Sequence, residues 1–98
     1  MFATGWTSLR YGRSRLTYAD ACQIATLAST SQARAVRLDL QGAKETTCGA
    51  LARLVQLRAA LLKVGGELCV EGLQGRAKGL YEIHGMDRLL PRAGTCMG

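Results

Sequence analysis

The sequence has no long apolar run. No stretch approaches the roughly 20 consecutive apolar residues of a membrane-spanning helix, and residues 1–15 lack the apolar core of a secretion signal. These absences predict a chain that does not insert into a membrane, and we expect it in the cytoplasm.

The residues that build metal and catalytic sites are also scarce. The chain has one histidine, His84, and its four cysteines, Cys22, Cys48, Cys69 and Cys96, contain no C-x-x-C pair, so a zinc site is not expected. The glycine-rich phosphate-binding motifs and the G-x-S-x-G motif are absent. We therefore predict no catalytic residue, no metal and no cofactor, and a protein that is not an enzyme.

The same residues have ordinary structural interpretations. Cys22, Cys48 and Cys69 lie in apolar runs or at an element boundary, which predicts buried or half-buried reduced thiols, and Cys96 in the tail is expected to be exposed. No local spacing sets a serine or cysteine beside His84, so this residue is interpreted as a helix cap or a packed ring.

The net charge of +6 raises the question of a nucleic-acid partner. Thirteen lysines and arginines produce this charge, but they are scattered along the chain and accompanied by only five aromatic residues. Nucleic-acid binding uses clustered cations and aromatic platforms, so the pattern argues against it.

Hydrophobic periodicity predicts alternating strands and helices. Period-2 alternation marks strands and 3.6-residue spacing marks helices, with glycines at their ends. The predicted elements are an edge strand near 6–11, a helix capped by Thr17 or Asp20, a central strand at 35–40, a loop at 44–49, a helix ending near Lys63, a strand at 67–71, a helix at 76–83 and a short strand or turn at 86–91.

This order predicts an α/β fold with a small mostly parallel sheet and flanking helices, because strand–helix–strand units require crossovers between parallel strands. Ninety-eight residues suffice for one hydrophobic core, so we expect one domain over 1–98. The helix ending near Lys63 is the strongest, with an apolar stripe of Leu51, Leu54, Val55, Leu61 and Leu62.

The segment Thr46-Thr47-Cys48-Gly49 falls between the central strand and this helix. Hydroxyls and free amides meet at such a helix N-terminus, which favours anions. One interpretation is simple capping by Thr46 or Thr47. The other is phosphorylation of a threonine, which adds about two negative charges that the helix start accepts and an apolar partner repels.

Several segments together resemble a STAS domain, the module of anti-sigma factor antagonists and sulfate-transporter tails. The resemblance covers about 16–91 and leaves 92–98 as a tail. Its segments are Val36-Arg37-Leu38-Asp39-Leu40-Gln41-Gly42, Thr46-Thr47-Cys48-Gly49-Ala50-Leu51, Leu57-Arg58 to Gly65-Gly66-Glu67-Leu68, and Leu80-Tyr81-Glu82-Ile83-His84-Gly85-Met86-Asp87-Arg88-Leu89.

The resemblance implies a STAS-like fold and a regulatory protein that binds a kinase-like anti-sigma factor, in signal transduction and transcription regulation. It places the partner-binding surface at Thr46, Thr47, Cys48, Gly49 and Leu51. Thr47 takes the position of the phosphorylated family serine if Gly49 matches the loop glycine, whereas a gapless match from Asp39 puts Cys48 there.

This sequence departs from the family pattern at the loop. Thr46 or Thr47 replaces the family aspartate, Glu45 stands where an apolar residue is usual, and only 6–11 remains for the usual N-terminal two-strand ribbon. These departures favour an alternative, a STAS subunit of a phospholipid-trafficking ABC transporter that binds its ATPase subunit without phosphorylation. Self-association through a strand edge stays open.

Overall fold

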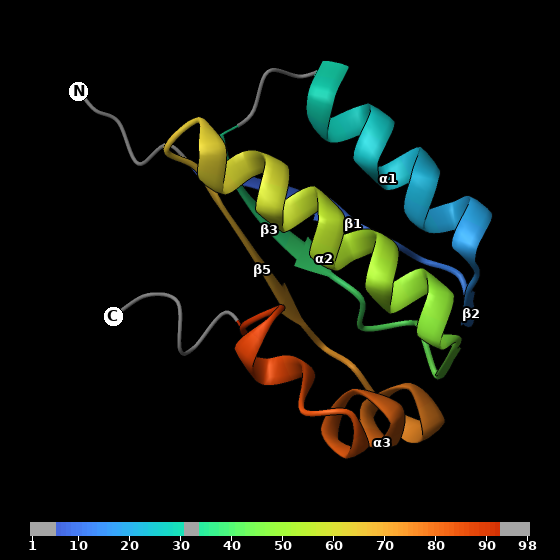
Figure 1. Ribbon diagram of the computed structural model, residues 1–98. Coiled ribbons are helices and arrows are strands. Elements are labelled where there is room, and N and C mark those ends of the chain that lie inside the picture. Colours follow the sequence, from blue (N-terminus) through green and yellow to red (C-terminus); the bar gives the residue numbers. More distant parts are fainter. Residues whose placement is uncertain (1–5, 31–33, 93–98) are drawn as a thin grey trace.

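Strands and helices alternate along residues 6–30 and 34–92, which are the residues that the computed structural model describes (Figure 1). The elements are β1 (Trp6–Arg10), β2 (Arg15–Leu16), α1 (Tyr18–Thr30), β3 (Ala35–Asp39), β4 (Glu45–Thr46), α2 (Cys48–Lys63), β5 (Glu67–Glu71), α3 (Gly75–Ile83) and the 3-10 helix η1 (Met86–Arg88). The predicted α/β alternation is confirmed.

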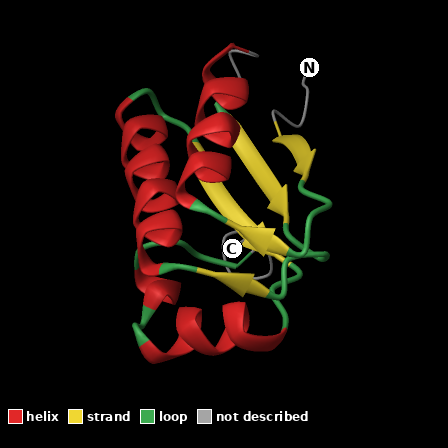
Figure 2. Ribbon diagram, turned by 90° about the vertical axis from the view of Figure 1, so that its right-hand side faces the viewer, coloured by secondary structure: helices red, strands yellow, loops and turns green. Residues whose placement is uncertain are grey.

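The main sheet has the order β1-β3-β5, and both neighbouring pairs are parallel. Its register aligns Leu9 with Leu38 and Leu38 with Val70, so apolar side chains of adjacent strands share one face. Helices α1 and α2 lie side by side over that face, as Figures 1 and 2 show. A small, mostly parallel sheet with flanking helices was predicted and is present.

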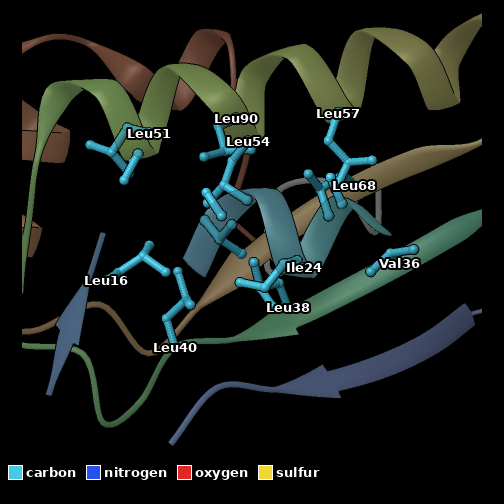
Figure 3. Packing of buried hydrophobic residues seen from close by; sticks show 14 of the residues in the cluster. Leu16, Ile24, Val36, Leu38, Leu40, Leu51, Leu54, Leu57, Leu68 and Leu90 are labelled. Carbon is cyan, nitrogen blue, oxygen red and sulfur yellow. The ribbon is translucent and has the colours of Figure 1, made fainter. Parts of the chain in front are cut away.

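The core fills the space between the sheet and these two helices (Figure 3). In β3, Val36 and Leu38 are completely buried while the alternate residues Ala35, Arg37 and Asp39 are partly exposed. This alternation is expected for a strand covered on one face. The α2 side chains Leu54 and Leu57 pack onto the same cluster. Burial of each large aliphatic side chain stabilises the fold by about 1.5–3 kcal/mol.

The apolar stripe of α2 differs in one detail from the prediction. Leu57 is buried, whereas Leu62 is 46% exposed. The 3.6-residue period places Leu57 on the line between Leu54 and Leu61 and rotates Leu62 away from the sheet. The closing segment also differs, since η1 forms where a strand or turn was expected.

A second, smaller sheet pairs β2 with β4 in parallel, with Arg15 opposite Glu45 and Leu16 opposite Thr46. The prediction of a loop over 44–49 is therefore wrong for Glu45 and Thr46, and it is also wrong for Cys48 and Gly49, which begin α2. Two-residue strands carry no periodicity that the sequence could reveal. Because α1 follows β2 and α2 follows β4 after a single residue, this pairing holds the first turns of both helices together.

Glycines end α2 as predicted. The amide of Gly66 donates to the carbonyl of Leu61 at 2.7 Å, and Gly65 adopts a φ of +79°. A Cβ atom on Gly66 would lie 2.0 Å from the carbonyl oxygen of Arg34. Glycine is thus required here so that β5 can start beside β3.

The cysteines depart from the expectation of buried or half-buried reduced thiols. Cys22 is free and half-buried, but Cys48 is free and exposed. Cys69 is buried and disulfide-bonded, so its predicted reduced state is wrong. Cys96 lies outside the described residues. Within the described ranges, no helix is long and apolar enough to cross a membrane.

Candidate functional site

The start of α2 carries most of the residues that the sequence singled out. Thr47 connects β4 to α2 with extended backbone angles, φ −126° and ψ 161°, and its Oγ1 accepts a hydrogen bond from the amide of Ala50 at 3.1 Å. This is the N-cap geometry preferred by Ser, Thr, Asp and Asn. The capping interpretation of Thr47 is confirmed.

The four remaining predicted residues have different environments. Thr46 is half-buried and its hydroxyl donates to the carbonyl of Leu16 at 2.9 Å, whereas Cys48 and Gly49 are exposed. Leu51 is completely buried, so its prediction as a partner contact is wrong. One helical turn separates Leu51 from Thr47, and its side chain points into the core beside Leu54.

The structure brings His84 next to Cys48. The Sγ atom of Cys48 lies 3.4 Å from Nε2 of His84, and both residues are exposed. No local spacing sets a serine or cysteine beside His84, and this contact joins residues 36 positions apart. Local spacing could therefore not have revealed it.

The end of α3 explains why His84 lies there. Helix α3 packs against β4, and the amide of Ala77 donates to the carbonyl of Lys44 at 2.9 Å. His84 is the C-terminal cap of α3, as one of its two interpretations predicted, and Gly85 follows in the left-handed conformation with φ +59°. Figure 2 shows α3 beneath the first turn of α2. The β4 segment thus positions both partners of the contact.

An exposed aromatic ring borders the same helix start. Tyr18, the first residue of α1, is 56% exposed, and its Cδ1 would lie 3.8 Å from a Cβ atom placed on Gly49. Tyr18, Thr47, Cys48, Gly49 and His84 therefore form one continuous accessible area, which we name the α2-start surface.

The electrostatics of this surface favour a negative group. The first turn of α2 contains no acidic residue, and the amide groups of a helix N-terminus carry partial positive charge. Thr47 satisfies the Ala50 amide. A negatively charged group attached at the helix start would meet the helix dipole with no acidic side chain in that turn to oppose it.

The start of α1 differs chemically from the start of α2, although the strands that precede the two helices, β2 and β4, are paired. Thr17 and Asp20 form a reciprocal capping box, in which the Asp20 amide donates to Thr17 Oγ1 at 3.2 Å and the Thr17 amide donates to Asp20 Oδ2 at 3.0 Å. Hydrogen bonding with Tyr11, and then with the backbone and side chain of Thr17, lowers the pKa of Asp20 to about 2. Burial, followed by interaction with Asp20, raises the pKa of Tyr11 to about 12.

Other features of the described residues do not suggest a small-molecule or metal site here. Within 6–30 and 34–92, no group of three or more His, Cys, Asp or Glu residues could hold a metal ion. A hollow of about 150 Å³ at the end of β5, lined by residues such as Leu73, Tyr81 and Arg92, includes no residue of the α2-start surface. Asp39, at the end of β3, accepts from the Gln41 amide at 2.9 Å and so orders the following turn.

Comparisons of the chain with protein-family models and with curated proteins find no match.

Proposed function

We propose that this chain is a regulatory, non-catalytic STAS-like domain that binds a kinase-like protein partner through the α2-start surface. The order of its motifs supports the family, and the α/β alternation with a parallel sheet agrees with it. The single observation that carries the proposal is the joint exposure of Thr47, Cys48 and Gly49 at the start of a long helix.

Phosphorylation of Thr47 would switch this binding. Thr47 is exposed, and a phosphate oxygen would accept the amide hydrogen bond that Oγ1 accepts in the unmodified chain. The modified helix start would therefore stay folded while its charge changed by about two units. A partner that binds the neutral surface would then be repelled.

The burial of Leu51 reduces the set of residues that a protein partner can contact. Because Leu51 is buried, a partner reaches Thr47, Cys48 and Gly49 and, beyond them, Tyr18 and His84. Aromatic side chains are enriched at protein interfaces because they combine apolar area with a polar end. We therefore add Tyr18 and His84 to the proposed contact.

The experiment begins with affinity capture from the native cell and identification of the co-purified protein and of any phosphate on the 46–48 peptide. Binding of that partner is then measured for Thr47→Glu and Thr47→Ala. We expect Thr47→Glu to weaken binding about tenfold more than Thr47→Ala, because both remove the threonine but only one adds charge. Thr26→Glu, an exposed threonine of α1, is the matched control and should bind as the unmodified chain does.

Equal losses for the two Thr47 variants would contradict the phosphorylation switch. One feature of the loop favours the ABC transporter alternative: in the gapless match, Cys48 occupies the serine position and cannot accept phosphate from a serine/threonine kinase. Capture of an ABC ATPase subunit together with an unmodified loop would establish that alternative. Both partners act in the cytoplasm, and since disulfides are rare there, the redox state of Cys69 in the cell tests this location.

A further inference from the structure

The contact between Cys48 and His84 combines a nucleophile with a proton acceptor. The two atoms, Sγ and Nε2, are 3.4 Å apart, within the distance over which a thiol can donate to an imidazole nitrogen. In the tautomer with its proton on Nδ1, His84 presents an acceptor to the thiol. Such a pair is the arrangement that activates a cysteine.

The position of the thiol in α2 adds a second element. Cys48 is the first residue of this 16-residue helix, and no acidic residue occurs in the first turn. Negative charge that develops on sulfur as the proton leaves is stabilised by the helix N-terminus. The thiol is also exposed, and the residue that follows it, Gly49, has no side chain to cover it.

The chain supplies its own reference thiol. Cys22 is also free, but it is half-buried in the middle of α1. It is neither at a helix start nor in a described contact with His84, whose Nε2 lies against Cys48. Cys22 and Cys48 therefore carry the same free thiol group in different environments, so the reactivity of Cys22 is the reference for that of Cys48.

We propose that Cys48 is a modification site that forms a mixed disulfide with small disulfides such as glutathione disulfide, with His84 as the proton acceptor. Sγ of Cys48 attacks one sulfur of the small disulfide, a new sulfur–sulfur bond forms, and the original one breaks. The thiol proton passes to Nε2 of His84 and then to the departing thiolate. Cys48 is oxidised, and half of the small disulfide is reduced to a free thiol.

The modification would place a peptide-sized polar group on the α2-start surface, beside Thr47 and Tyr18. Its effect on partner binding rests on the proposed function, because it requires that this surface be the contact. The reactivity of Cys48 does not, since it needs only the thiol, the imidazole and a small disulfide. The two proposals can therefore fail separately.

The test uses the whole chain and glutathione disulfide at pH 7, with no protein partner. Mass spectrometry of the peptides measures the rate of glutathione addition at Cys48 and Cys22 in the same molecules. We expect addition at Cys48 to be at least about tenfold faster, and His84→Gln to slow it about tenfold while leaving the rate at Cys22 unchanged. The rate ratio of the original chain to His84→Gln should shrink towards pH 10, where thiols ionise without help.

Two controls separate the proton acceptor from other causes. Arg88→Gln removes an exposed charge from η1 and should leave the rate at Cys48 within about twofold, because small surface charges are screened. In denaturant the two cysteines should react at similar rates, since the contact with His84 is lost. Equal native rates at Cys48 and Cys22, or an unchanged rate at Cys48 in a folded His84→Gln variant, would overturn the proposal.

Discussion

The first turns of α1 and α2 are connected to the sheet in the same way but differ in their capping hydrogen bonds. Each helix follows a two-residue strand of the β2–β4 sheet, and a threonine, Thr17 or Thr47, connects strand and helix in each case. At α1 the third residue after the threonine is Asp20, whose carboxylate accepts a hydrogen bond from the Thr17 amide. At α2 the equivalent residue is Ala50, which has no side-chain acceptor and is buried.

Because of this difference in capping, the start of α1 has a structural role, whereas the start of α2 is accessible. At α1, Thr17 and Asp20 satisfy each other with reciprocal hydrogen bonds, the Tyr11 hydroxyl donates to the carbonyl of Arg15 at 2.7 Å, and Asp20 is only 9% exposed. At α2, one hydroxyl caps one amide, and the residues that follow, Cys48 and Gly49, face solvent. An unfinished capping box therefore leaves room for a modification or a partner, whereas the completed box fixes the fold.

Among the variants that test this comparison, those that remove the cap hydroxyls of Thr17 and Thr47 should change the free energy of unfolding most. Thr17→Ala should lower the free energy of unfolding by about 2 kcal/mol, at the upper end for helix caps, because it also deprives Asp20 of a donor. Thr47→Ala should lower the free energy of unfolding by about 1 kcal/mol, because it removes a single capping hydrogen bond, to the Ala50 amide, and leaves no carboxylate without a donor. Denaturant unfolding measures both, with Thr17→Ser and Thr47→Ser as controls that keep the hydroxyl. A larger loss at Thr47 than at Thr17 would contradict the comparison.

Acid should act on the α1 start. The folded-state pKa of Asp20, about 2, lies below the 3.8 of an unperturbed aspartate, so ionised Asp20 stabilises the fold above about pH 4. This contribution is lost as the pH falls from about 4 to 2. Asp20→Asn should flatten the stability profile in that window, measured by thermal unfolding at successive pH values. A profile as steep as that of the unmodified chain would show that other carboxylates cause the loss.

The smallest change in stability is expected for a substitution of Gly49, which should stabilise the fold, whereas removal of a cap hydroxyl destabilises it. A Cβ atom there would lie 3.8 Å from Thr47 Oγ1 and from Tyr18 Cδ1, ordinary contact distances. Gly49→Ala should therefore raise stability by about 0.5 kcal/mol, because alanine favours helix more than glycine does. If the α2-start surface binds a partner, the same variant should weaken that binding. A loss of stability in denaturant unfolding would mean that glycine is needed for the fold.

Local patterns predicted the fold to a large extent. The alternation of Val36 and Leu38 marked the central strand, and Gly65-Gly66 marked the end of α2, because these signals arise within a few residues. The β2–β4 pairing was not predictable in this way. Each of its strands is two residues long, and its stability comes from a partner about thirty positions away in the chain.

The candidate site was predicted only where its features depend on local sequence signals. Thr47 was expected as a cap because threonine before a strong helix is a local signal. The buried position of Leu51 depends on the phase of α2 over the sheet, and the contact of Cys48 with His84 depends on where α3 packs. The disulfide bond of Cys69 likewise has no local signal in the sequence.

The direct passage from β4 into α2 through one residue also governs how this chain could vary in length. Thr46 is fixed opposite Leu16, and Thr47 is fixed by its cap, so no spare residue separates the sheet from the helix. An insertion between them would rotate the first turn of α2 by about 100° per added residue. Insertions and deletions should therefore be tolerated far better in the exposed segment 12–14 than at 46–48, where they would carry Cys48 away from His84.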